Sequence, residues 1–139
     1  MAKTVATILG IVFLIVGIAG FVAPGMLGTH LSLAHNLVHI ISGIIALYFG
    51  LAGTLAAARL FDIIFGIVYG LLGIAGFLLG SQGNSSMPGM MPSHHMFKVI
   101  PGVLELGSRD HAIHILLGII FLIGGFLTKT AINRTADRT

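Results

Sequence analysis

The sequence contains no cysteine, and charged residues make up only 8% of its 139 positions. A chain without cysteine has no disulfide, no thiolate metal ligand and no cysteine nucleophile. Hydrophobic residues make up 56% of the chain, and together with the low charge this excludes an ordinary soluble core. At this length we expect a single membrane domain, residues 1–139.

Four long apolar stretches account for this composition. They cover residues 5–22, 37–54, 63–79 and 112–128. At about 1.5 Å per residue, each is about long enough to cross a hydrocarbon layer roughly 30 Å thick. The sequence therefore predicts four transmembrane helices.

The positive charges are distributed unevenly about these predicted spans. Lys98 and Arg109 fall on one side, and the other side carries Lys3, Arg59, Lys129, Arg134 and Arg138. The positive-inside rule then places both termini in the cytoplasm and the loops near 23–35 and 80–110 outside. We expect a multi-pass protein of a bacterial inner or photosynthetic membrane. Its net charge of +3 suits contact with membrane lipid, not with nucleic acid.

The chain contains an internal repeat. The segment "GIVFLIVGIAGFV" at 10–22 matches "GIVYGLLGIAGFL" at 66–78, and "HNLVHIISGII" at 35–45 matches "DHAIHILLGII" at 110–120. Each copy holds two spans, so both copies enter the membrane with the same polarity. The predicted fold is an all-α integral membrane protein: a four-transmembrane-helix bundle of two tandem helical hairpins related by a parallel pseudo-twofold axis.

The two copies differ in one segment. Repeat 1 covers about 5–54 and repeat 2 about 60–128, with a Met/His-rich outer-loop insertion at about 81–98 and a cytoplasmic tail at 129–139. Within the bundle, glycine and alanine stripes are expected to let the helices approach closely. Arg59 and Asp62, three residues apart, are expected to form a local pair or a helix cap.

All seven histidines lie in the predicted outer loops or in the first turns of the second and fourth spans. His35 and His39 are four residues apart, and His111 and His114 are three apart, so each pair can share a helix face. The repeat would let the two pairs face each other, with His39 opposite His114.

Three interpretations of these histidines remain open. The first is structural: neutral imidazoles cap helix ends and bond to loop carbonyls or to each other at the membrane interface. In the second, His35, His39, His111 and His114 bind zinc or copper. In the third, His39 and His114 are axial ligands of a tetrapyrrole, haem or chlorophyll.

The insertion contains a second candidate metal site. Its segment "MPGMMPSHHM" supplies six candidate copper ligands: Met87, Met90, Met91, His94, His95 and Met96. Thioether and imidazole together form a soft ligand set that suits Cu(I). A flexible exposed loop rich in Gly, Pro and Ser has the same composition, so both interpretations stay open.

The sequence offers no set of catalytic groups. It has no paired carboxylates on one face, no phosphate-binding glycine loop and no His-Glu-x-x-His motif, so we expect no enzyme activity. Ion-coupled carriers need ionisable groups at mid-membrane depth, which these spans barely offer. A small carrier or channel is therefore only a further alternative.

Three long stretches resemble a known family. "HNLVHIISGIIALYFGLAG" at 35–53, "ARLFDIIFGIVYGLLGIAGFLLG" at 58–80 and "DHAIHILLGIIFLIGGFL" at 110–127 are similar to the bacterial four-helix membrane family catalogued as domain of unknown function 4383. The matching signatures are Asn36, His39, Gly43; His111, His114, Gly118; and the opening of the third span at 58–61. The resemblance implies a four-span fold of unassigned activity, and it does not cover the Met/His-rich insertion.

These observations lead to one leading hypothesis. We expect a non-catalytic accessory or structural subunit of a larger bacterial membrane complex, respiratory or photosynthetic, whose partners are membrane lipid and other membrane-protein subunits or further copies of the chain. The alternative is an outer-side module that binds copper, zinc or a tetrapyrrole through His39 and His114.

Overall fold

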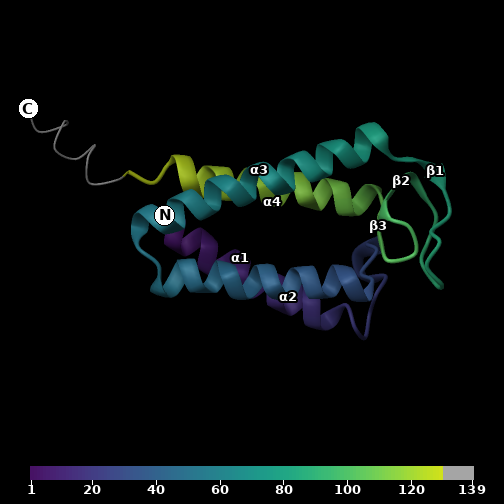
Figure 1. The fold of residues 1–139 in the computed structure, drawn as a ribbon, viewed down its shortest axis with the longest axis horizontal. Coiled ribbons are helices and arrows are strands. Elements are labelled where there is room, and N and C mark those ends of the chain that lie inside the picture. The colour runs from purple at the N-terminus through teal and green to yellow at the C-terminus, as the bar shows by residue number, and fades with distance from the viewer. Residues whose placement is uncertain (130–139) are drawn as a thin grey trace, which may run out of the picture.

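The computed structural model describes residues 1–129. From residue 130 onward the predicted cytoplasmic tail, 129–139, lies outside the described residues, together with Arg134 and Arg138. Within the described part, four helices are long and apolar enough to cross a membrane, as predicted. They form an elongated bundle in which the loop after the first helix and a small sheet lie at the same end, which we call the sheet end (Figure 1).

Each helix begins before the apolar stretch that predicted it. They are α1 (Ala2–Ala19), α2 (Leu33–Leu47, continued by the π-helical turn η2, Tyr48–Ala52), α3 (Leu55–Leu79) and α4 (Ser108–Phe126). Side chains cap the first turns of α2 and α3. Ser32 Oγ accepts a hydrogen bond from the His35 amide, and Thr54 Oγ1 accepts one from the Ala57 amide, both at 3.2 Å.

Helix pairing follows chain order. The most extensive contacts join α1 to α2 and α3 to α4, and α1 also contacts α3 and α4. Glycine permits the closest approach: a Cβ at Gly73 of α3 would lie 2.6 Å from the carbonyl oxygen of His111 on α4. The predicted close packing through small residues is present at this position.

A three-stranded sheet interrupts the helical pattern between α3 and α4. Its strands are β1 (Ser81–Gly83), β2 (Ser93–Ile100) and β3 (Leu104–Leu106), antiparallel in the order β1-β2-β3. The all-α prediction is wrong in this respect, and the insertion predicted at 81–98 contains strands as well as loop. Its backbone groups are satisfied by strand pairing, which local composition did not indicate.

A buried carboxylate holds the segment before β2 and the turn between β2 and β3 together. Glu105 of β3 is fully buried and accepts hydrogen bonds from Ser85 Oγ (2.7 Å), the Ser86 amide (2.8 Å) and the Gly102 amide (2.8 Å). Burial alone would raise the pKa of Glu105, but these hydrogen bonds outweigh it and lower the pKa to about 2. Glu105 is therefore ionised at neutral pH and fixes the turn over the bundle.

An aromatic layer fills the middle of the bundle. Phe13 of α1 stacks on Tyr69 of α3, with ring centroids 5.2 Å apart, and lies 6.1 Å from Phe121 of α4. Histidines of α2 and α4 lie on one side of this layer. The ring centroid of His39 is 5.5 Å from that of Phe13, and the ring centroid of His114 is 5.4 Å from that of Tyr69. The layer thus separates the histidine region from the opposite end.

The predicted pair between Arg59 and Asp62 does not form. Because α3 already begins at Leu55, both residues lie inside the helix. Arg59 Nε donates to the Gly125 carbonyl oxygen at 3.0 Å. Asp62 is fully buried near Gly124, and neither of its carboxylate oxygens has a hydrogen-bond partner among the described residues. Sequence spacing predicted a local pair or a helix cap, but the tertiary packing buries Asp62.

Candidate metal centre

Three histidines meet near the sheet end of the bundle. His35 and His39 come from consecutive turns of α2, and His114 comes from α4. Each offers one ring nitrogen such that these nitrogens all lie within 4.8 Å of one another. The three side chains are nearly inaccessible, with exposed fractions of 3%, 6% and 3%. We call these residues the histidine trio.

The trio contains four ring nitrogens that are buried and have no hydrogen-bond partner among the described residues. They are His35 Nε2, His39 Nδ1, His39 Nε2 and His114 Nδ1. A buried polar atom without a partner costs about 1–3 kcal/mol, and such atoms are uncommon in folded proteins. Several of them at one point make the trio a candidate site for a group that binds imidazole nitrogen.

The orientation of His35 is set by the loop after α1. His35 Nδ1 lies 2.8 Å from the His30 carbonyl oxygen, so Nδ1 carries the proton and donates it. The other nitrogen, Nε2, is then left with its lone pair facing the trio. Such a backbone carbonyl behind a histidine is the usual support of a metal ligand.

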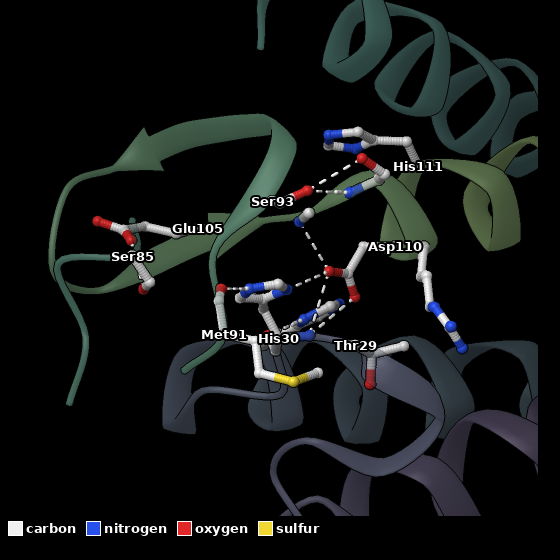
Figure 2. A network of polar contacts seen from close by, with 12 residues as sticks. Thr29, His30, Ser85, Met91, Ser93, Glu105, Asp110 and His111 are labelled. Carbon is white, nitrogen blue, oxygen red and sulfur yellow. Dashed lines mark hydrogen bonds and ion pairs between the residues drawn. The ribbon is translucent and has the colours of Figure 1, made fainter. Parts of the chain in front are cut away.

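His30 itself joins this loop to α4 and to the insertion. Its Nδ1 lies 3.0 Å from Asp110 Oδ2, its Nε2 lies 2.7 Å from the Met91 carbonyl oxygen, and its backbone amide donates to the same carboxylate (Figure 2). The hydrogen bond to Asp110 raises the pKa of His30 above its usual 6.5, although burial acts in the opposite direction. Both ring nitrogens of His30 face acceptors. This residue therefore joins the loop to α4 and to the insertion, and neither nitrogen is left to bind a metal ion.

The fourth predicted helix histidine lies apart from the trio. His111 Nε2 donates to the His95 carbonyl oxygen at 2.8 Å, and the ring packs 5.3 Å from Phe77 and 6.4 Å from Phe97. Gly76 of α3 lies against the ring and leaves room for it. His111 therefore supports β2 on the α3–α4 hairpin.

The six predicted copper ligands of the insertion lie in different environments. Met87 and Met90 line a hollow over the start of α2, whereas Met91 and His94 line another beside His30 and Arg109. His95 packs on Phe77, with ring centroids 5.4 Å apart. Met96 is buried in β2. The structure brings these residues to the sheet end but divides them between several environments.

Sequence reasoning missed three polar residues that shape this region. Asp110, Glu105 and His30 are all buried at 2% exposure or less, and each is a hub of hydrogen bonds. Asp110 lies at the third position of α4, where a carboxylate accepts from the amide of the residue before the helix, here Gly107 at 2.8 Å. That spacing was a readable signal. His30 and Glu105 lie in loop and strand, where only the tertiary fold assigns a partner.

No curated protein and no solved structure matches the chain. A family described as "Domain of unknown function (DUF4383)" matches residues 3–127, which include all but the first residue of α1, the other three helices, the sheet and the histidine trio. The resemblance drawn from the histidine and glycine signatures is thereby confirmed. The chain belongs to the DUF4383 family.

Proposed function

We propose that this membrane protein binds one transition-metal ion, copper or zinc, through His35, His39 and His114. The observation that supports it is the convergence of three buried imidazoles whose ligand nitrogens lie within 4.8 Å of one another. One unpartnered nitrogen of each residue would gain an acceptor for its lone pair. The proposal thus accounts for an arrangement that is otherwise costly.

The geometry of the trio is close to that of a three-histidine site. Zinc binds imidazole at about 2.0–2.1 Å, so three nitrogens around one tetrahedral ion lie about 3.3 Å apart. Small side-chain rotations would close the trio to that spacing, because all three residues stand on rigid helices. Three protein ligands leave one coordination position open. The trio carries no negative charge, so a monovalent Cu(I) ion would be desolvated at lower cost than Zn²⁺.

The same geometry favours a metal ion over a tetrapyrrole. A hollow of about 180 Å³ lies beside His35 and His114. Pockets for drug-sized ligands have volumes of about 300–1,000 Å³. A macrocycle between His39 and His114 would have to displace the aromatic layer, whereas an ion fits among the rings.

We further propose that the sheet end faces the outer side of a bacterial inner membrane. Lys98 and Arg109 lie at this end, and Lys3 and Arg59 lie toward the other. Figure 1 supports this arrangement, because the chain reverses at the sheet end both after α1 and after α3. The two hairpins would then be copies of equal membrane polarity, as the internal repeat predicts.

Metal titration of the purified protein tests the proposal. The expected result is one equivalent of Cu(I) or Zn²⁺ per chain, retained through gel filtration. His39→Ala should abolish this binding, because His39 is the trio member whose two ring nitrogens are both buried without a hydrogen-bond partner. His94→Ala is the matched control, since His94 is exposed on β2 and lies outside the trio.

Two results would contradict the proposal. One is the absence of a stoichiometric ion in folded wild-type protein. The other is equal metal content in wild type and His39→Ala. If copper is lost only when Met87, Met90 and Met91 are changed to Leu, the insertion and not the trio is the copper site.

A second proposal, an accessory subunit of a larger membrane complex, rests on a different observation. Large apolar side chains are exposed outside the four long helices at the sheet end: Val22, Leu27, Met91, Val99, Ile100 and Val103. Exposed apolar patches mark contact with a partner or with the membrane interface. Extraction in mild detergent tests this proposal, which predicts co-migration with a larger complex. Migration as a lone small species would contradict it.

A further inference from the structure

A narrow apolar groove between α2 and α3 leads from the membrane-facing surface to the histidine trio. Val38 and Val68 form part of its wall and are 44% and 55% exposed, so the groove opens where lipid surrounds the bundle. Leu104 and Leu106 of β3 also line it. The groove is about 180 Å³ in volume, and no charged side chain is among its lining residues.

The polar groups of the groove are few. His35 and His114 line it, each about 3% exposed and each with a buried ring nitrogen that lacks a partner. Ser42 and Tyr69 also line it, and the Tyr69 hydroxyl donates to Ser42 Oγ at 3.3 Å. The Ser42 proton is left to donate to a ligand. A molecule in this groove would thus meet apolar walls and neutral hydrogen-bonding groups.

We propose that the groove binds the ring of a lipid-soluble quinone or quinol, with His114 and Ser42 as hydrogen-bond partners of the ring oxygens. Such a molecule reaches the groove from the bilayer without crossing water. Its ring is neutral, as the uncharged lining requires. A phospholipid headgroup would bring charges that no lining residue balances.

The size of the groove supports a single ring. An apolar protein cavity of about 150 Å³ holds a benzene ring. The groove, at about 180 Å³, therefore accepts a six-membered ring, while the isoprenoid tail would leave between Val38 and Val68 toward lipid.

Ring binding does not depend on the metal ion. An imidazole that ligates a metal through one nitrogen keeps an N–H on the other and donates it to a nearby acceptor. His114 can therefore serve the trio and the ring together, or the ring alone. His39 is not among the residues that line the groove, so its removal separates the two proposals.

Binding of decylubiquinone to the full chain in lipid nanodiscs tests the inference, with empty nanodiscs as the baseline. We expect saturable binding of one molecule per chain. Val68→Phe, which fills the mouth of the groove, should weaken binding by about tenfold or more. Leu71→Phe is the matched control, because Leu71 is 60% exposed on the same helix and lies outside the groove.

Infrared spectroscopy of the bound ring reports on its hydrogen bonds and complements the binding affinities. With ¹³C-labelled carbonyls, bound decylubiquinone should show a carbonyl stretch lowered by hydrogen bonding, and Ser42→Ala and His114→Gln should each remove part of that shift. His39→Ala should lose the metal and keep the ring, whereas Val68→Phe should keep the metal and lose the ring. Because each variant loses only one of the two ligands, failure of quinone binding can be distinguished from failure of metal binding.

The inference is overturned if decylubiquinone partitions without saturation or if Val68→Phe and Leu71→Phe bind it equally. It is equally overturned if wild type retains a phospholipid that Val68→Phe lacks and that decylubiquinone does not displace. Should Val68→Phe fold poorly, the carbonyl shift in wild type and Ser42→Ala decides the question.

Discussion

Two kinds of buried polar residue lie side by side at the sheet end. Glu105 and His30 have hydrogen-bond partners for their polar side-chain atoms, and these residues tie loops and strands together. His39, a few residues along α2, has none from either ring nitrogen. Because stability favours satisfied groups, the unpartnered nitrogens of the histidine trio support the metal ion that we propose.

Replacing Glu105 with glutamine tests the structural role of a buried residue whose polar atoms have hydrogen-bond partners. We expect a loss of about 1–3 kcal/mol, since buried donors would face a neutral amide. The folded pKa of about 2 lies below the usual 4.5, so the stabilisation by ionised Glu105 is complete above pH 4.5 and is lost as pH falls toward 2. Thermal unfolding in detergent at pH 7 and pH 3 measures this effect. The difference in unfolding midpoint between wild type and Glu105→Gln should be smaller at pH 3 than at pH 7. An equal difference at the two pH values would contradict the stabilising role of ionised Glu105.

At the scale of elements, close approach of helix backbones holds the α3–α4 hairpin together. Inside a bilayer, apolar burial does not favour one helix pair over lipid contact, so shape and small residues decide the pairing. Gly73 packs against the α4 backbone, whereas a Cβ at Gly70 on the same helix would meet no atom within 4 Å. Two glycines one turn apart thus have different roles.

This difference predicts different effects of adding a methyl group. Gly73→Ala should destabilise the protein by about 1–3 kcal/mol, because backbone atoms of α4 would have to move. Gly70→Ala should be neutral or slightly stabilising, by up to about 1 kcal/mol from helix propensity. The midpoints of thermal unfolding of both variants, followed by circular dichroism, provide the comparison. Equal destabilisation by the two changes would contradict the packing described.

At the scale of the whole molecule, much of the architecture could be predicted because a bilayer restricts the choices. Length and hydropathy predicted four spans, and the spacing of His35 and His39 placed them on one face of α2. The sheet could not be predicted, because pairing between β2 and β3 depends on partners distant from the local Gly-, Pro- and Ser-rich composition. His111 was misplaced for a related reason: packing against Phe77 and Gly76 of α3, not helix spacing, sets its direction.

The proposed orientation in the membrane is directly testable because the chain has no cysteine. Asn84→Cys places one thiol at the sheet end and Ala56→Cys places one near the opposite turn, both at exposed positions. In intact cells a membrane-impermeant maleimide should label Asn84→Cys, and it should label Ala56→Cys only after permeabilisation. The reverse pattern would contradict the proposed topology.

X-ray absorption spectroscopy of copper- or zinc-loaded protein shows whether the histidine trio binds the metal ion that we propose. For zinc we expect a first shell with three imidazole nitrogens at about 2.0–2.1 Å. In His39→Ala that shell should be lost, and in His94→Ala it should be unchanged. A first shell of sulfur or of oxygen alone, or an identical spectrum for His39→Ala, would contradict the claim.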